Sequence, residues 1–505
     1  MEIDKIAEQL RDRFSAPRKE YHKRRVVFWN DPNGEFKDMI SELSLENVKV
    51  LVLTGDNNFY AKYLLHTLDP ESDYLVYVPF RYNKPEDNWL RDIELMEESF
   101  CADLHTMRMN QFHMEESVPI RRAMKLYSKF FESKERSAKF EAMGGSFDTA
   151  QQIHLNVLAV LTRAKSNQPN DIIRAILTDS LYVEDNQAIA AIRKFGSEEV
   201  LWDFITTLTG FTPSEEVSLF ELAAHILITS LSGIVEPKKI SSLARFISLE
   251  KQSACYGIID DWQSSDKRES LYELSLLLDE TYHISQALEK IDIEILIKAD
   301  ALPCIDESII RYYMREISEN VIKTAEIIDA VEKRRSSSWY ERYSYFYDGL
   351  YYTAKIQEFC TQHDEGFHYG EYTDLWKFYC DELYLCDTYY RKFHAAFQKS
   401  LKNAVSDLDD LFKSVADLVK LLYRNKFLSP VNCEWNQLTI SMLAERSNLP
   451  YIPQQTDFYR HTVKPLVNES RVYVIISDAL RFEVAKELTH RLITETNGTA
   501  SITAM

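Results

Sequence analysis

Glycine is scarce in this sequence. Only 12 of the 505 residues are glycine, whereas roughly 7% is usual in globular proteins. Folds with many tight turns need glycine at positions of positive φ, so the scarcity argues against repeated β architectures and favours long helices. The length suggests about three domains of roughly 100–200 residues each. An apolar content of 45% is enough for packed cores.

Paired cysteines and long apolar runs are also missing. The sequence has seven cysteines but no Cys-x-x-Cys pair, and their spacings fit no zinc ribbon. They are typical of reduced, mostly buried thiols in a cytoplasmic protein. No apolar run approaches the ~20 residues needed to cross a bilayer, and the N-terminus is an amphipathic helix of mixed charge, unlike a signal peptide. We therefore expect no membrane partner.

Several common catalytic and nucleotide-binding motifs do not occur. There is no Gly-x-x-x-x-Gly-Lys loop and no Gly-x-Gly-x-x-Gly, which argues against a glycine cradle for phosphates. A Gly-x-Ser-x-Gly elbow is missing as well. These absences exclude the commonest nucleotide-binding and serine-hydrolase designs.

The charge is strongly negative. Lys and Arg total 59 against 79 Asp and Glu, which gives −20, so the chain as a whole repels nucleic acid. The one basic cluster is the segment Arg18–Arg25. We favour its interpretation as the solvated end of an N-terminal helix running into a strand, and contact with DNA through this segment stays open.

The first 115 residues predict a small α/β domain. Continuous apolar runs predict three buried strands, at 25–29, 48–53 and 74–78. Apolar faces of period 3.6 predict helices before and between them, at 1–16, 36–43, 60–68 and 89–96. Apolar strands that alternate with helices are typical of a parallel sheet covered on both faces.

The middle of the chain predicts helices. Residues 116–300 and 301–460 carry period-3.6 apolar faces with few prolines and glycines, and we divide them into two helical domains. The stretch 339–397 is unusually rich in Tyr, Phe and Trp. Packing of wide aromatic helices is favoured there over a ligand cage.

Residues 461–505 predict a return to α/β structure. An apolar run over 471–477 is followed by Asp478, by an amphipathic helix and by the start of a second strand near 501. A sheet of one and a half βα units cannot bury both faces, so we expect the chain to be truncated. A carboxylate just past the carboxyl end of a parallel strand lies where open α/β sheets bind ligands, and it can coordinate a divalent cation. Capping of the next helix by Asp478 or Ser477 is an equally weighted alternative.

Two strings resemble one protein family. VYVIISDALRFEVAKEL, at 472–488, resembles the opening of the PglZ domain, a branch of the alkaline phosphatase superfamily. FWNDPNGEF, at 28–36, is similar to an N-terminal Trp-Tyr-Asp-Pro motif of the same proteins, with Asn30 in place of Tyr. The order of α/β, helical and α/β regions also matches. The chain thus resembles the PglZ proteins of type I BREX bacteriophage-defence systems.

The resemblance implies a metal-dependent phosphatase, phosphodiesterase or nuclease in full-length form. It gives Asp478 the role of metal ligand for a divalent ion, expected to be zinc. It also implies that the nucleophile and the other ligands lie beyond residue 505, so no catalytic residue is assigned, and we expect this chain to be inactive and to hold no metal firmly. Arg481 and Glu483 match the family string. For Arg481, a partnership with Asp478, contact with a phosphate and an ion pair on the helix surface all stay open.

Two further expectations complete the hypothesis. Asp31, which follows the first strand, is favoured as a helix cap over a ligand site, and its motif's role stays open. The resemblance implies an incomplete alkaline-phosphatase-like domain at 461–505 and partners such as a DNA methyltransferase and small accessory proteins. An acidic, aromatic-rich helical region suits protein partners, so we expect a scaffold. The alternative is a purely structural assembly protein without catalytic activity.

Overall fold

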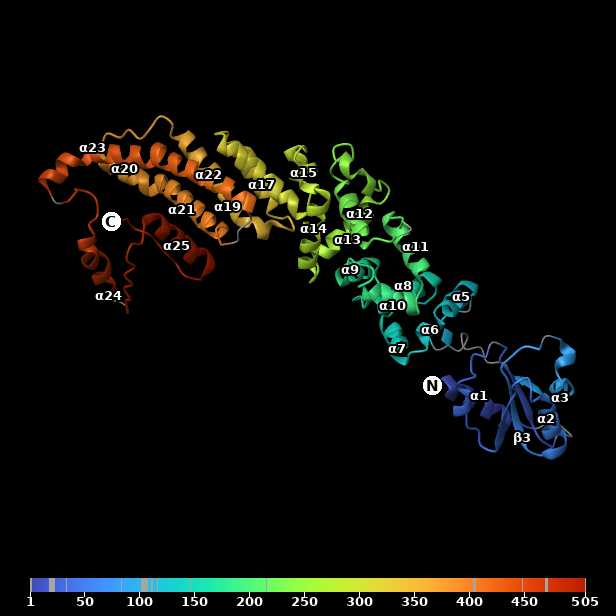
Figure 1. Ribbon diagram of the computed structural model, residues 1–505. Helices are drawn as coiled ribbons and strands as arrows, with labels where there is room; N and C mark the ends of the chain where they lie inside the picture. The colour runs from blue at the N-terminus through green and yellow to red at the C-terminus, as the bar shows by residue number, and fades with distance from the viewer. Residues whose placement is uncertain are drawn as a thin grey trace. The chain divides into compact units, whose positions relative to one another are not determined.

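The structure is a computed structural model that divides into two compact units (Figure 1). The first unit is Met1–Thr206 with Thr212–Leu219, and the second is Thr207–Phe211 with Phe220–Met505. The predicted domain boundaries at 115, 300 and 460 stay predictions. The structure describes residues 2–17, 23–32, 34–82, 84–100, 108–109, 112–115, 117–145, 147–214, 216–402, 406–446, 448–467 and 471–504.

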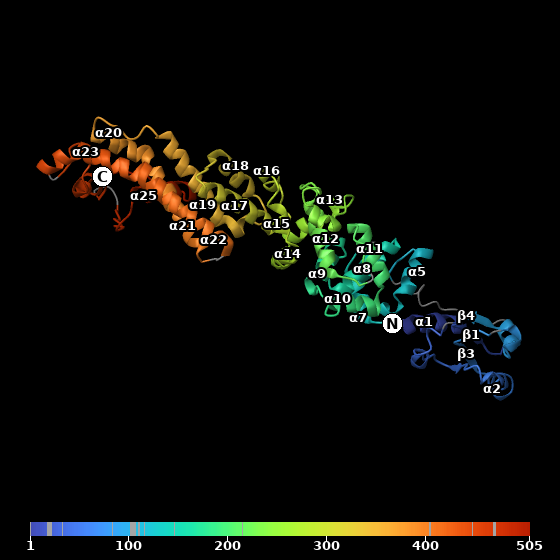
Figure 2. The ribbon, with the colours of Figure 1, turned by 45° about the horizontal axis from the view of Figure 1, so that its top comes forward.

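The first unit contains a four-stranded parallel sheet, seen with α1 beside it in Figure 2. Its strands lie in the order β2-β3-β1-β4. Every pairing between neighbours is parallel, which confirms the predicted sheet. The strands are β1 (Val26–Asn30), β2 (Val48–Val52), β3 (Asp73–Val78) and β4 (Glu98–Phe100).

Each face of the sheet carries its own core. Val27 and Trp29 of β1 pack on one face with Ile6 and Leu10 of α1. Val26 and Phe28 point to the other face, where they pack with side chains of α2, η2 and α3. Successive residues of a strand point to opposite faces, so the continuous apolar run of β1 follows from burial on both sides.

The helix predicted at 36–43 is wrong. Residues 35–39 form turns, and only the short 3-10 helix η1 (Ile40–Glu42) follows. Gly34 adopts a φ of +68°, and the Asp31 carboxylate accepts a hydrogen bond from the backbone N–H of Phe36 at 2.8 Å. Such side-chain bonds to a nearby backbone compete with helix formation. The apolar side chains of this segment still reach the core.

The other elements of the first unit are helical. The π-helical segment η2 (Leu64–Leu68) extends α2, and the short 3-10 helix η3 (Pro85–Asp87) precedes α3. The α-helices are α1 (Glu2–Ser15), α2 (Asn58–Tyr63), α3 (Arg91–Met96), α5 (Val118–Leu126), α6 (Ser128–Phe131), α7 (Lys134–Ala142), α8 (Ala150–Thr162), α9 (Pro169–Asp179), α10 (Gln187–Phe195) and α11 (Glu198–Thr209), whose end belongs to the second unit.

The second unit is helical throughout its regular elements. Its 3-10 helices are η4 (Ser241–Phe246) and η7 (Gln455–Asp457), and its π-helical segments are η5 (Tyr379–Leu383), η6 (Tyr423–Leu428) and η8 (Tyr459–Val463). Its α-helices are α12 (Leu219–Leu231), α13 (Gln252–Gln263), α14 (Arg268–Tyr282), α15 (Ile284–Leu288), α16 (Ile293–Leu296), α17 (Pro303–Ser318), α18 (Thr324–Arg334), α19 (Tyr340–Gln362), α20 (Tyr372–Phe378), α21 (Tyr384–Ser400), α22 (Ser406–Leu422), α23 (Ser429–Glu445), α24 (Lys464–Val467) and α25 (Phe482–Glu495).

The aromatic-rich stretch forms the packing between α19, α21 and α22, which lie side by side (Figure 1). The ring of Phe412 on α22 lies 5.2 Å from that of Phe346 on α19 and 5.7 Å from that of Phe393 on α21. Gly349 leaves the space on α19 that the Phe412 ring occupies. These contacts are the aromatic helix packing that was the favoured interpretation of this stretch.

Two global features bear on the expected environment. Among the described residues, no helix has the length and apolar character needed to cross a lipid bilayer. The cysteines that the structure describes are all free thiols, most of them buried, and Cys101 lies outside the described residues. Burial raises the pKa of the Cys255 thiol to about 12, so this side chain is an inert core residue.

Candidate metal site and its supporting helix

The segment before Asp478 is extended but is not a strand. Residues 471–477 have no ladder partner, and the side chains of Ile475 and Ile476 are 91% and 90% exposed. The predicted buried strand at 471–477 is therefore wrong for the described chain, as is the second strand near 501. A parallel strand needs neighbouring strands for its hydrogen bonds and layers on both faces, and no strand of the described chain lies beside this segment.

Asp478 itself is exposed, in a turn just before α25. Ala479, the next residue, has a φ of 56°, which is uncommon for a residue with a side chain and marks a sharp change of chain direction. In the part of the chain described, no hydrogen bond or ion pair engages the Asp478 carboxylate. The side chain is thus open to a ligand and does not cap α25, whose N-cap is Arg481.

The described residues do not form a metal site around Asp478. Nowhere in the described ranges do three or more His, Cys, Asp or Glu side chains gather closely enough to hold a metal ion. Divalent cations take several protein ligands, so Asp478 alone does not fit a firmly bound zinc. Its placement is compatible with one ligand of a larger set.

Arg481 and Glu483 pair with each other. The Arg481 Nε lies 3.0 Å from Glu483 Oε1, and the two side chains are 57% and 1% exposed. Of the three alternatives for Arg481, the structure shows an ion pair, with Glu483 as the partner and Asp478 not involved. The Glu483 side chain is therefore buried at the start of α25, with Arg481 as its ionic partner.

Helix α25 is anchored on α21 (Figure 1). Glu487 of α25 accepts a hydrogen bond from the Arg391 guanidinium at 2.5 Å and lies 3.4 Å from Lys392 Nζ. Although partial burial opposes the shift, these two cations lower the pKa of the Glu487 carboxyl. At the start of α25, the Phe482 ring lies 5.7 Å from the ring of Tyr384 on α21. Charge and aromatic contacts together fix the helix that follows Asp478.

Asp31 is a buried hydrogen-bond acceptor. It is 2% exposed, and besides the Phe36 N–H it accepts the Tyr77 hydroxyl of β3 at 2.5 Å. Burial, followed by this bond and the charge of Asp31, raises the pKa of Tyr77. No helix starts after Asp31, so the predicted helix cap is corrected to a turn cap that ties β1 to β3.

The basic segment Arg18–Arg25 is partly accounted for by α1. Arg25 is 5% exposed, and its guanidinium donates to the carbonyls of Arg13, Ala16 and Pro17 at the end of that helix. A cation at these positions satisfies carbonyls that lack helical partners, so Arg25 has a structural role. Arg18 and Lys19 lie outside the described residues.

Sequence reasoning missed a second polar centre in the second unit. Asp387 of α21 is 7% exposed and accepts the hydroxyl groups of Tyr379 and Tyr423. The available signal was an aspartate on the apolar face of a helix that is otherwise rich in aromatic residues, because an acid in that position needs buried partners. The aromatic content of the stretch concealed it.

Comparison with known proteins places the C-terminal segment in a family. Residues 458–505 match the family described as the BREX system PglZ alkaline phosphatase-like domain. The chain is 30% identical, over its whole length, to a Bacillus cereus protein named alkaline phosphatase-like protein PglZ, of which it covers 58%. It is 26% identical over 98% of its length to an Escherichia coli protein named alkaline phosphatase-like protein BrxZ, again covering 58%.

The chain thus spans 58% of the length of each of these relatives. No solved structure matches it. The family match falls on the segment that contains Asp478, Arg481 and Glu483, and the two relatives align along nearly all of the chain, including both compact units. The chain is thus similar, along nearly all of its length, to BREX alkaline phosphatase-like proteins, and its C-terminal segment matches the PglZ domain.

Proposed function

We propose that this chain is the platform of a BREX phage-defence protein, which binds partner proteins and carries the first elements of an alkaline phosphatase-like domain. The observation that supports this proposal most directly is the difference between the residues before Asp478 and those after it. On one side α25 is fixed to α21 through Arg391 and Glu487, and on the other the apolar residues before Asp478 are exposed.

We expect these exposed apolar side chains to be buried by another protein surface. Tyr473, Ile475 and Ile476 are 78%, 91% and 90% exposed in consecutive or near-consecutive positions, and contiguous exposed apolar side chains mark interaction surfaces. An extended segment also leaves its backbone N–H and C=O groups available for pairing. We infer that it becomes a sheet strand of the alkaline phosphatase-like domain in the full-length proteins of this family.

The catalytic part of the proposal concerns Asp478. In a complete domain it would supply one carboxylate ligand to a divalent metal, expected to be zinc, and the metal would stabilise charge on a phosphoryl group. The activity would be that of a phosphatase, phosphodiesterase or nuclease. This chain alone would lack it, because one carboxylate is too few ligands.

Phosphodiesterase assays with zinc and with manganese test the catalytic part. They would compare the 505-residue chain, a form extended to the length of its relatives, and the extended form with Asp478→Asn. We expect activity only in the extended protein, and a loss of at least about a hundredfold on Asp478→Asn. Asp266→Asn, at an exposed turn, is the matched control and should retain activity. Activity in neither length would refute the enzyme proposal, and full activity in the short chain would refute the platform account.

The scaffold part has its own test. The 505-residue chain would be co-expressed with a BREX DNA methyltransferase and small accessory proteins and purified through a tag on the chain. Retention of these proteins in a defined stoichiometry is expected. A monomer that retains none of them would contradict the scaffold.

A purely structural assembly protein is the second candidate. The observation behind it is the exposed apolar segment before Asp478, which suits a docking surface whether or not the completed domain is catalytic. It predicts partner retention together with inactivity at both lengths, so the two experiments above distinguish it from the first candidate.

A further inference from the structure

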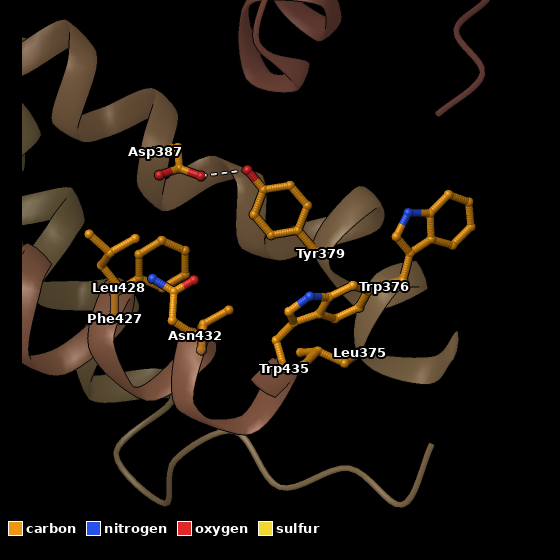
Figure 3. A pocket seen from close by; sticks show the side chains of 9 residues that line it. Leu375, Trp376, Tyr379, Asp387, Phe427, Leu428, Asn432 and Trp435 are labelled. Carbon is orange, nitrogen blue, oxygen red and sulfur yellow. Dashed lines mark hydrogen bonds between the residues drawn. The ribbon is translucent and has the colours of Figure 1, made fainter. Parts of the chain in front are cut away.

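A pocket of about 330 Å³ lies in the second unit, and it is lined by α20, α21, α23, η5 and η6, which precede Asp478 in the sequence (Figure 3). Its size lies within the range of small-ligand sites. Four aromatic, three aliphatic and two polar side chains line it. The residues that matter here are Trp376, Tyr379, Asp387, Phe427, Asn432 and Trp435.

Two π-helical turns build this pocket around Asp387. Segment η5 begins at Tyr379 and η6 begins at Tyr423. The Tyr379 hydroxyl donates to Asp387 Oδ2 at 2.6 Å, and the Tyr423 hydroxyl donates to Oδ1 at 2.5 Å. Isolated π-helical turns are rare and occur frequently at functional sites. Each of these two segments places a tyrosine against the same carboxylate, beside the pocket.

The negative charge of Asp387 has no cationic partner in the described structure. Its two bonds come from neutral hydroxyl groups, and burial together with the charge of Asp387 raises the pKa values of Tyr379 and Tyr423, so both stay protonated. Arg481, whose charge acts on Tyr423, is already paired with Glu483. A carboxylate offers about four lone-pair positions, so Asp387 can accept further donors.

The side chains that line the pocket suit a cation that carries apolar groups. Indole and phenol faces attract ammonium and guanidinium groups, most strongly where water is displaced. Figure 3 shows the side chains of Tyr379, Trp435 and Asn432 around the pocket. Asp387 lies across the pocket from Trp435. The Asp387 carboxylate would repel an anion. A neutral apolar ligand would give this carboxylate no further hydrogen-bond donor.

We propose that this pocket binds an organic cation, an ammonium or guanidinium group on an apolar stem, with Asp387 facing the charge and Trp376 and Trp435 packing against the stem. The cation belongs either to a free amine or guanidine or to a Lys or Arg side chain of another protein. The site does not use Asp478 and does not rest on the proposed phosphohydrolase chemistry, although the ring of Tyr379 lies 6.1 Å from that of Phe482 at the start of α25.

Binding is tested by titrating the 505-residue chain with butylammonium, with 1-butanol as the neutral analogue of the same shape. Calorimetry and tryptophan fluorescence would follow the titration. We expect saturable binding of butylammonium and binding at least about tenfold weaker for 1-butanol. A parallel titration with a short peptide containing one internal lysine identifies the source: preference for the peptide assigns a protein side chain, and preference for butylammonium assigns a free amine.

Two variants locate the site. Asp387→Asn should weaken butylammonium at least about tenfold by removing the charge. Because that change affects a buried side chain, Asn432→Lys on the exposed face of α23 provides a second route. It places a tethered ammonium beside the pocket and should abolish binding. Asn436→Lys is the matched control, since Asn436 is exposed on the same helix and does not line the pocket, and it should bind normally.

Three results would overturn the proposal. They are no saturable binding of butylammonium by the unmodified chain, equal binding of 1-butanol, and unchanged binding by a folded Asn432→Lys or Asp387→Asn variant. Thermal unfolding by circular dichroism confirms that each variant is folded.

Discussion

The guanidinium group of Arg334 forms two parallel hydrogen bonds to the carboxylate of Asp306. Nε donates to Oδ1 at 2.9 Å and Nη2 donates to Oδ2 at 2.6 Å, and the two side chains are 2% and 0% exposed. Arg334 Nη1 also donates to the Ala299 carbonyl at 2.6 Å, and the Tyr347 hydroxyl donates to Asp306. This buried network joins α18, α17 and α19.

Loss of one member should therefore be costly. Asp306→Ala leaves the Arg334 charge buried without its partner, and we expect the free energy of unfolding to fall by about 3–5 kcal/mol. Urea unfolding checks this. The matched control is Asp329→Ala, which removes an exposed pair with Lys333 on the same helix as Arg334 and should cost no more than about 0.5 kcal/mol. Similar losses for the two variants would contradict a special role for the buried pair.

Two glycines in helices should respond to alanine in opposite directions. At Gly349 of α19 an added Cβ would overlap the ring of Phe412, whereas at Gly257 of α13 it would meet nothing within 4 Å. We expect Gly349→Ala to destabilise the chain by about 1–3 kcal/mol through overpacking. Gly257→Ala should stabilise it by about 0.5–1 kcal/mol through helix propensity. Thermal unfolding of both variants tests the packing of α19 against α22, and stabilisation by Gly349→Ala would show that this packing is loose.

Stability should fall on mild acidification, in part because of His225. This side chain on α12 is 7% exposed, and its Nε2 donates to the Thr209 carbonyl at 2.8 Å. Burial lowers its pKa below the usual 6.5, against the opposing effect of the hydrogen bond to Thr209. The unfolded chain then binds more protons at pH values below about 6.5, so this contribution is present above that pH and is lost as the pH falls.

Urea unfolding between pH 5.5 and 7.5 measures the effect. His225→Gln retains a side-chain N–H donor but cannot be protonated, so its stability should vary less with pH than that of the unmodified chain. His490→Gln, at an exposed position of α25, is the control for the loss of one histidine and should change the pH dependence less than His225→Gln does. An identical pH dependence for His225→Gln would exclude His225 as a contributor.

The contact between α25 and α21 should depend on Glu487. Glu487→Ala removes the pairs with Arg391 and Lys392, whose partly exposed geometry suggests a loss of up to about 1 kcal/mol. Amide hydrogen exchange in α25 should then accelerate up to about fivefold, because exchange reports local opening. Glu495→Ala, at the exposed end of the same helix, should leave exchange unchanged. Equal protection in both variants would mean that the aromatic contacts alone hold α25.

The sheet was predictable where the strands are buried on both faces. The apolar runs that predict β1, β2 and β3 are continuous, and such runs have few alternatives next to helical patterns. Strand β4 was not predicted, because it has only three residues and is defined by its pairing with β1. The helix predicted after β1 does not form, because the hydrogen bond from the Phe36 N–H to the Asp31 carboxylate favours a turn. The spacing of apolar residues gives no information about such a bond.

The candidate sites show the same limit. Asp478 was predicted from its local pattern and from the family resemblance, and the structure leaves it accessible. The strand expected before it requires partners that the described chain does not supply. The pocket around Asp387 depends on Tyr379 and Tyr423, which are 44 positions apart in the sequence, and on two π-helical turns. No rule of local spacing brings these residues together.

The π-helical turn η5 fixes the direction in which the Asp387 side chain points. A π-turn accommodates a single residue more than regular α-helical winding, and each residue of an α-helix turns the chain by about 100°. Regular winding of the same residues would therefore rotate the Asp387 carboxyl by about a quarter of a revolution, away from Tyr423. A homologue with one residue fewer between α20 and α21 could keep this acidic centre with regular winding alone, whereas a homologue of equal length needs the π-turn.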